Sequence, residues 1–107
     1  NYDDVWEIVL NQAKQKRYLG KTIIPGAFTD WDNTPRYGKQ ASVFKGVNPE
    51  RFKFYMEKLL EITKDNDEIG VIFINAWNEW GESAYLEPDS INKYSYLEVI
   101  ESLYKGL

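Results

Sequence analysis

Histidine and cysteine are both absent from this sequence. Without cysteine there are no disulfides, thiolate nucleophiles or zinc–thiolate sites, and the redox compartment stays open. Without histidine the chain offers no His-dependent catalytic triad, no His-rich metal site and no imidazole as a general base near neutral pH. Any acid–base chemistry of this chain must therefore use carboxylates, tyrosine or lysine.

Long hydrophobic runs are also missing, since none approaches the roughly 20 residues of a membrane-spanning helix. We therefore expect a soluble chain with no membrane span. The opening Asn1-Tyr-Asp-Asp-Val5 has neither an initiator Met nor an apolar leader, so we expect a piece of a longer protein without a visible targeting signal. A formal net charge of -4 argues against a nucleic-acid partner, which needs a basic surface. The compartment is unknown, although a biosynthetic role would favour the cytoplasm.

Aromatic residues are plentiful, with four Trp and eight Tyr among 107 residues. Aromatic faces stack against the apolar faces of sugar rings, although most aromatic side chains in proteins lie in the core. The length allows one small domain with a modest core, and the balance of 43% hydrophobic and 28% charged residues is that of a globular chain.

Hydrophobic periodicity predicts the order helix, strand, helix, strand, helix. We expect helices from Asp3 or Asp4 to about Lys16, from Asn48-Pro49-Glu50 to about residue 67, and over 94–105. We expect strands over 22–28 and 69–74. Gly20 should stop the first helix, and Pro25-Gly26 should mark where the first strand leaves its sheet.

Two unusual loops, 29–47 and 75–88, follow the carboxyl ends of the expected strands. The apolar run 69–74 favours a strand covered on both faces, as parallel strands are. This order predicts an α/β fold of the barrel or doubly wound kind, in which such loops build the active site. Two strands alone leave edges unpaired, so we expect missing barrel strands, a partner chain, or self-association through those edges.

The segment Asn75-Ala-Trp-Asn-Glu-Trp-Gly-Glu-Ser-Ala-Tyr-Leu-Glu-Pro88 carries the strongest candidates, Glu79 and Glu82. Spaced three apart, they would share one face of a helical turn with Cβ atoms about 5 to 6 Å apart. Two such groups between indoles should titrate as a coupled pair, which supplies a base and an acid. Glycosidic bond cleavage needs such a pair, and a separation of roughly 5 to 5.5 Å goes with retention of configuration. The alternative is two glutamates on a solvated turn.

The same segment holds candidate substrate-binding residues. The alternatives are core positions for the indoles and turn positions for Asn75 and Asn78. The candidates that we predict to contact substrate in this segment are Trp77, Asn78, Trp80, Tyr85 and Glu87.

The segment Phe28-Thr-Asp-Trp-Asp-Asn-Thr-Pro-Arg-Tyr-Gly38 reads as a second sugar subsite. Trp31 would stack on a ring, while Asp32, Asn33 and Arg36 would bind hydroxyls. The alternative is an Asx-turn loop in which Arg36 pairs with Asp32. Asp30, Asp32 and Asn33 resemble half a calcium loop, but its glycine and closing glutamate are missing, so we predict no metal and no cofactor.

These two segments, Trp31–Arg36 and Asn75–Pro88, resemble in order and separation the last part of WbsX-type proteins, which are assigned as glycosyltransferases of bacterial surface-polysaccharide or lipopolysaccharide biosynthesis. Those proteins are similar to the endo-α-mannosidases and endo-mannanases of glycoside hydrolase family ninety-nine, which are (β/α)8 barrels. The resemblance covers most of this chain, but this chain corresponds to only about the last third of such a protein. It implies the C-terminal β-α-β-α portion of a TIM-type barrel, as a single domain or fragment over 1–107.

The resemblance also implies roles for the carboxylates. Glu79 would deprotonate the neighbouring sugar 2-hydroxyl to give an anhydro-sugar intermediate, Glu82 would protonate the leaving oxygen, and configuration would be retained. The sequence departs from the hydrolases at two positions, because Gly81 stands where they usually have His and Ser83 where they usually have Gly.

Our leading hypothesis is a glycan-processing enzyme, hydrolase or transferase, that acts on α-linked bacterial polysaccharide with a glycan or nucleotide-sugar substrate. The alternatives are a non-catalytic carbohydrate-binding module and a structural fragment. Because a barrel's active site draws residues from several strands, we expect the isolated chain to be inactive.

Overall fold

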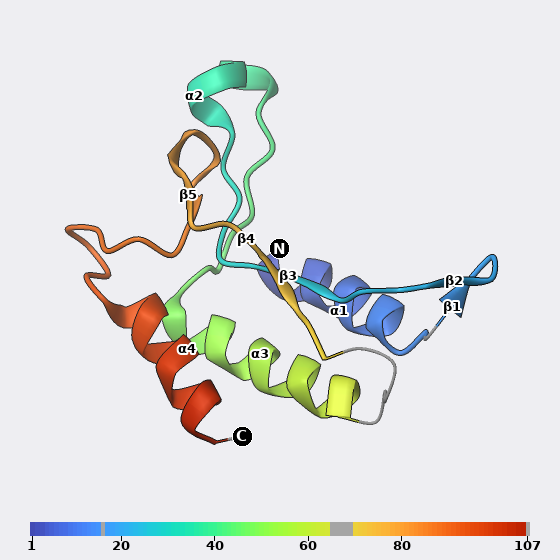
Figure 1. The fold of residues 1–107 in the computed structure, drawn as a ribbon. Helices are drawn as coiled ribbons and strands as arrows, with labels where there is room; N and C mark the ends of the chain where they lie inside the picture. The colour runs from blue at the N-terminus through green and yellow to red at the C-terminus, as the bar shows by residue number, and fades with distance from the viewer. Residues whose placement is uncertain (16, 65–69, 107) are drawn as a thin grey trace.

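The structure, a computed structural model, describes residues 1–15, 17–64 and 70–106. Three long helices, α1 (Tyr2–Ala13), α3 (Pro49–Lys64) and α4 (Ser95–Lys105), alternate along the chain with two strands, β3 (Gly26–Phe28) and β4 (Phe73–Asn75), that pair in parallel. Figure 1 shows the three helices side by side, and the loops that follow β3 and β4 rising together above them. The predicted α/β order is confirmed. None of the described helices is long and apolar enough to cross a membrane.

The helix starts differ in how well they were predicted. α3 begins as expected, because the Asn48 side chain accepts a hydrogen bond from the Arg51 amide at 2.8 Å and Pro49 takes the first helical position. α1 is capped by Asn1, whose side chain accepts from the Asp3 amide at 3.0 Å. The prediction of Asp3 or Asp4 as the cap was therefore wrong. α1 also ends at Ala13, and Lys16 lies outside the described residues.

A short hairpin replaces the predicted helix stop and the first part of the predicted strand. β1 (Arg17–Tyr18) and β2 (Lys21–Thr22) pair antiparallel around Leu19 and Gly20, whose φ angles are 51° and 77°. Two positive φ angles in a two-residue loop are typical of hairpin turns. Gly20 thus turns a hairpin and does not end a helix, which corrects the prediction. Figure 1 shows this hairpin projecting away from the helices.

The strand β3 begins at Gly26, although Pro25-Gly26 was expected to mark the point where the strand leaves its sheet. Gly26 opens β3 and lies opposite Phe73, and the carbonyl of Pro25 accepts from the Phe73 amide at 3.1 Å. Proline has no amide hydrogen to donate, so it suits a position at the start of a strand as well as at its end. The predicted strand 22–28 was therefore too long at its amino end.

Only one face of the β3–β4 pair is covered by helices. Ala27 is buried and Ile74, its partner across the pair, packs against the helical core. On β4 and just before it, Phe73 is 63% and Val71 53% exposed. Within the described residues the predicted strand is therefore covered on one face, and the cover expected on the other face does not come from them; Ile69 lies outside these residues.

The region 29–47 is folded, whereas an irregular loop was expected. It contains the short helix α2 (Thr34–Tyr37) and a 3-10 turn, η1 (Gly38–Gln40). Its two limbs are joined by a bridge between Asp32 and Val43 and by the Phe44 amide, which donates to the Trp31 carbonyl at 2.9 Å. The proline at the second position of α2 and the glycine after it explain why so short a helix starts and stops there.

The core is mainly aromatic. The Trp6 ring stacks between Phe28 and Tyr55, with centroids 5.3 Å from each. On α3 the buried residues are Phe52, Tyr55, Met56 and Leu59. On α4 they are Tyr96 and Val99, whereas Tyr104 is 77% exposed.

A charged contact joins the starts of α1 and α3. Asp3 accepts a hydrogen bond from the Tyr55 hydroxyl at 2.6 Å and forms an ion pair with Arg51. The Tyr55 hydrogen bond, followed by the Arg51 contact, holds the pKa of Asp3 below its ordinary value. Folding therefore favours the ionised carboxylate at this position.

We predict that Asp3→Asn destabilises the protein at neutral pH and much less in acid. A carboxylate with a lowered folded pKa contributes stability above its unfolded pKa of about 3.9, and this contribution is lost as the pH falls through the folded value. Urea unfolding of the protein that contains this chain, at several pH values between neutral and strongly acid, measures the effect. The exposed neighbour Asp4 provides the control variant Asp4→Asn. A pH-independent effect of Asp3→Asn would contradict the prediction.

Candidate active site

The parallel pairing of β3 and β4 brings the two candidate segments together. Phe28 lies opposite Asn75, so the two segments that follow these residues leave the sheet at the same edge. A few residues further on, the Asp32 amide donates to the Glu82 carbonyl at 2.8 Å, which docks one segment on the other. Asn75 is the last residue of β4, so it does not form a turn.

Glu79 and Glu82 lie at the two ends of one tight turn. The segment folds as β5 (Asn78–Glu79), the 3-10 turn η2 (Trp80–Glu82) and β6 (Ala84–Tyr85), with Glu79 opposite Ala84. Ser83 closes the turn in a left-handed conformation at φ 56°. A 3-10 turn brings residues three apart nearly into line, so the two glutamates share one side of it.

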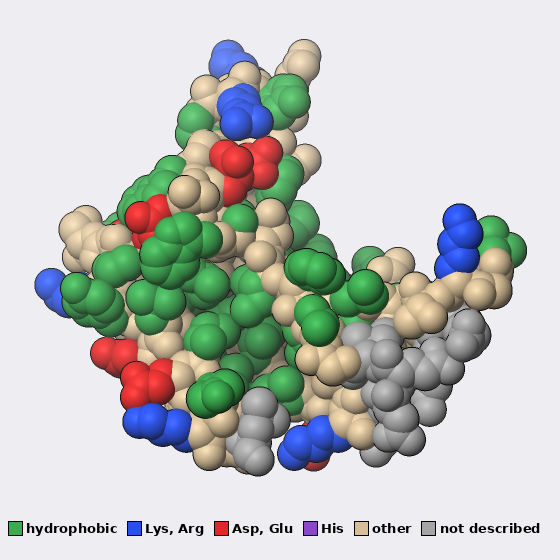
Figure 2. Space-filling view, in the orientation of Figure 1, with side chains coloured by type: hydrophobic (Ala, Val, Ile, Leu, Met, Phe, Trp, Pro, Cys, Tyr) green, Lys and Arg blue, Asp and Glu red, His purple; other side chains and the backbone are tan. Residues whose placement is uncertain are grey.

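Arg36 contacts both carboxylates. Its Nη2 lies 3.4 Å from Glu79 Oε1 and its Nη1 lies 3.5 Å from Glu82 Oε1. The side chains of Arg36 and Glu79 are 56% and 40% exposed, whereas Glu82 is 21% exposed. Near the α2 end of the molecule, Figure 2 shows acidic side chains lying next to a basic one. One guanidinium therefore offsets the repulsion between two carboxylates, in contacts that water weakens.

The alternative prediction for Arg36, a pair with Asp32, is not what the described residues form. Asp32 Oδ1 accepts from the amide of Thr34 at 2.9 Å and from its hydroxyl, and the hydroxyl contact, followed by the amide, lowers the pKa of Asp32. This is the Asx turn that the sequence suggested. Asn33 also stabilises the loop, since its Oδ1 accepts a hydrogen bond from the Ser42 amide at 2.7 Å.

Gly81 leaves the space that the Arg36 guanidinium occupies. A Cβ atom at position 81 would lie 3.4 Å from Glu79 Oε1 and 3.5 Å from Arg36 Nε. These are ordinary contact distances, so alanine fits, but a longer side chain would meet the ion pair directly. Gly81 thus lies directly against the ion pair that Arg36 forms with the two glutamates.

The indoles of this segment are not in the core. Trp77 is 54% and Trp80 47% exposed. One face of Trp80 stacks on Tyr85, with centroids 3.8 Å apart, and its indole nitrogen donates to Glu87 Oε1 at 3.1 Å. Asn78, also exposed, lies opposite Tyr85 in the β5–β6 pair. Trp31, from the other segment, is half-buried.

Asp89 is a structural residue of the site that sequence reasoning missed. Its Oδ2 accepts from the Tyr85 hydroxyl at 2.7 Å, and its Oδ1 accepts from the amides of Ile91, Asn92 and Lys93 at 3.0, 2.5 and 3.2 Å. Burial acts to raise the pKa of Asp89, but these hydrogen bonds outweigh it and lower the pKa. Burial, together with the Asp89 contact, raises the pKa of Tyr85 to about 12. The available signal was the Pro-Asp-Ser turn sequence.

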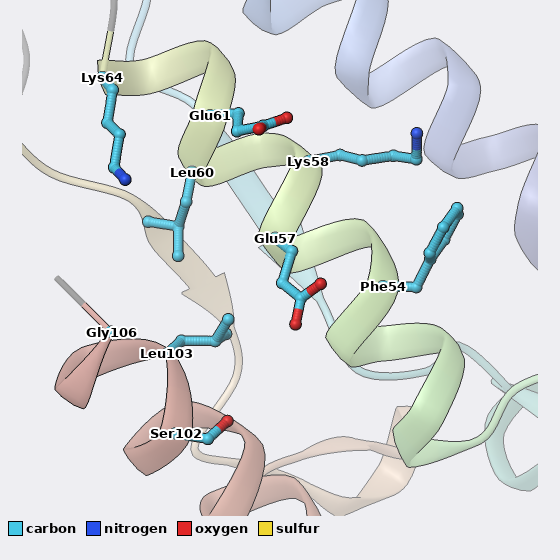
Figure 3. Close-up of a pocket in the computed structure, with 9 residues that line it drawn as sticks. All are labelled: Phe54, Glu57, Lys58, Leu60, Glu61, Lys64, Ser102, Leu103 and Gly106. Carbon is cyan, nitrogen blue, oxygen red and sulfur yellow. The ribbon is translucent and has the colours of Figure 1, made fainter.

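A groove of about 390 Å³ lies elsewhere, between α3 and α4. Figure 3 shows Glu57 and Glu61 on α3 and Ser102 on α4 among the side chains that line it. None of the predicted site residues lines this groove. The candidate site is therefore the convergence of the two loops and not this groove.

Comparison with known proteins places the chain in a family. The family described as "Glycosyltransferase WbsX" matches residues 1–100, and the chain belongs to it. It is also similar to a protein named "Uncharacterized protein WxcX" in two strains of Xanthomonas campestris pv. campestris, with 30% identity over 95 residues in each. These 95 residues are 87% of this chain but only 14% of the relatives' length. No solved structure matches the chain.

We predict that Asp89→Ala loosens the segment that follows the site. The amides of residues 91–93 would lose their shared anionic acceptor, and losing a capping acceptor costs about 1 kcal/mol. Hydrogen exchange at these amides should then become about fivefold faster or more. Ser90→Ala, next in the chain and exposed, is the control. Unchanged protection of these amides in Asp89→Ala would contradict the assignment.

Proposed function

We propose that the protein containing this chain forms or cleaves glycosidic bonds in bacterial surface polysaccharide, with Glu79 and Glu82 as its carboxylate pair. The supporting observation is the convergence of both carboxylates on the Arg36 guanidinium, beside the exposed rings of Trp77 and Trp80. Membership in the WbsX family and similarity to a Xanthomonas protein support the bacterial glycan context.

In the mechanism we propose, Glu79 takes the proton from the 2-hydroxyl of the sugar. The resulting oxygen attacks the anomeric carbon, and the glycosidic bond breaks as Glu82 gives its proton to the leaving oxygen. Water or an acceptor hydroxyl, deprotonated by Glu82, then attacks the anomeric carbon and opens the anhydro-sugar, and the released 2-oxygen recovers its proton from Glu79. Two displacements at one carbon retain its configuration. The choice between water and an acceptor separates hydrolase from transferase.

The charge of the described site favours a glycan over a nucleotide sugar. Among the described residues, Arg36 forms ion pairs with Glu79 and Glu82, and a third carboxylate, Glu87, accepts from the Trp80 indole and forms no ion pair. A diphosphate would meet net negative charge at this place, whereas sugar hydroxyls can donate to carboxylate oxygens. The exposed indole faces suit the apolar faces of sugar rings.

Replacing each glutamate with glutamine tests this proposal. In the protein that contains this chain, Glu79→Gln and Glu82→Gln should each lower turnover about 10²- to 10⁴-fold, because each removes a proton acceptor or donor and keeps the shape. Turnover is followed as new reducing ends released from a panel of purified α-linked bacterial polysaccharides. Binding of the same polysaccharides should change little.

The matched control is Glu57→Gln, a change of the same kind on the exposed face of α3. Unchanged turnover in both glutamine variants would rule out the carboxylate mechanism. Polysaccharide binding without turnover in the wild type would instead favour a carbohydrate-binding module, which the exposure of Trp77 at 54% also suits.

We also propose that strands outside this chain complete a (β/α)8 barrel around the bare face of the β3–β4 pair. β3 and β4 each pair with only one strand among the described residues. Phe73 and Val71 are exposed, and Figure 2 shows hydrophobic side chains across the centre of the visible face. Exposed apolar surface and open strand edges are unfavourable in an isolated protein.

Phe73→Ser tests this second proposal. If other strands cover Phe73, the variant should destabilise the protein that contains this chain by about 3 kcal/mol or more. Thermal unfolding measures the loss, with the 85% exposed Ile91 as the control in Ile91→Ser. Equal, small effects would contradict a covered face, whereas a loss that depends on protein concentration would indicate self-association through it.

A further inference from the structure

Asp30 is a half-buried carboxylate that the proposed mechanism does not use. It lies two residues beyond the end of β3, after Thr29, whose side chain is 1% exposed. Its Oδ1 accepts a hydrogen bond from the Trp31 amide at 2.6 Å. Asp30 therefore occupies the point where the chain turns from the sheet into the loop that carries Arg36.

The charge of Asp30 affects the pKa of tyrosines on three other elements. Burial is the main cause that raises the pKa of Tyr2 on α1, Tyr85 on β6 and Tyr96 on α4, and the Asp30 carboxylate adds to each. Burial likewise raises the pKa of Asp30, against the effect of the Trp31 amide and together with the charge of Asp32. Asp30 is thus a half-buried carboxylate at the end of the core strand, where the loop of the site begins.

One half of the site follows directly on Asp30 in the chain, and the charge of the carboxylate acts on Tyr85 in the other half. On one side, the residue after Trp31 donates its amide to the Glu82 carbonyl at 2.8 Å. On the other side, Tyr85 supports the Trp80 ring at 3.8 Å. A change in the direction in which the chain leaves Asp30 would therefore shift Arg36 and Glu82 relative to each other.

We propose that Asp30 is a positioning residue of the carboxylate site. Its Oδ1 fixes the Trp31 amide, and this sets the path by which the following residues reach Glu82. The effect of Asp30 on catalysis rests on the proposed function, whereas its hydrogen bond to the Trp31 amide does not depend on that function.

The experiment compares Asp30→Ala with Asp30→Asn in the protein that contains this chain. Asparagine keeps a side-chain oxygen that can accept from the Trp31 amide, and alanine does not. On the polysaccharide that the wild type cleaves, Asp30→Ala should lower kcat about tenfold to a hundredfold with little change in KM, because misplacing a catalytic group by about 1 Å is this costly. Asp30→Asn should recover most of kcat. Unchanged kcat in Asp30→Ala, or a folded Asp30→Asn as impaired as Asp30→Ala, would overturn the proposal.

Hydrogen exchange at the amides of Trp31 and Asp32 provides a readout that does not depend on activity. Both amides should exchange faster in Asp30→Ala and stay protected in Asp30→Asn, with exposed Asp4→Ala on α1 as the matched control. Equal protection in all variants would overturn the proposal even without any assay of turnover. If Asp30→Ala does not fold, loss of amide protection in a folded Asp30→Asn would overturn it.

Glu79→Gln and Glu82→Gln distinguish a failure of the proposed function from a failure of the positioning role of Asp30. If these variants keep full turnover while the amide exchange behaves as expected, the proposed function fails and the positioning of the loop by Asp30 stands. If they lose turnover while Asp30→Ala keeps both its kcat and its amide protection, only the inference on Asp30 fails.

Discussion

The register of one parallel strand pair determines where the candidate site lies. Phe28 lies opposite Asn75, so residues 29–47 and 75–88 leave the sheet at a common edge although they are far apart in sequence. The docking of Asp32 on Glu82, the reach of Arg36 and the stacking of Trp80 on Tyr85 all lie beyond this point. A shift of one residue in the pairing would turn every following side chain to the other face.

The aromatic core holds that pair in place from one side. Trp6 stacks on Phe28 of β3 and on Tyr55 of α3, so a single ring links α1, the sheet and the helix between its strands. The Tyr2 hydroxyl adds a hydrogen bond to the Phe28 carbonyl at 3.1 Å, at the last residue of β3. The buried core thus ends directly below the loops of the candidate site, and packed elements below a site help to fix its geometry.

The sequence predicted the elements with strong local signals. Asn48-Pro49 and the stripe of α3 identify a helix without any tertiary information, and the parallel order follows from alternating helices and strands. The hairpin at 17–22 and the helix at 34–37 were missed, because each is so short that a few turn residues decide it. The sequence could not tell which face of β4 this chain covers, because an apolar run has the same pattern whether its cover belongs to this chain or not.

Within the site, the sequence identified the residue types but not their partners. The pair Glu79 and Glu82 follows from spacing, and the Asx turn of Asp32 from local chemistry. The pairing of Arg36 with both glutamates links residues more than forty positions apart, and no local pattern contains such a contact. The role of Asp89 depends in the same way on a hydroxyl that β6 brings to it.

Arg36 and position 81 are in contact, since a Cβ atom at position 81 would lie 3.5 Å from Arg36 Nε. The two positions therefore constrain each other in any relative with this backbone. A larger residue at position 81 would pack against the residue at position 36, and covariation of the two across the family would be the evolutionary record of that contact. Comparing relatives at either position alone would miss it.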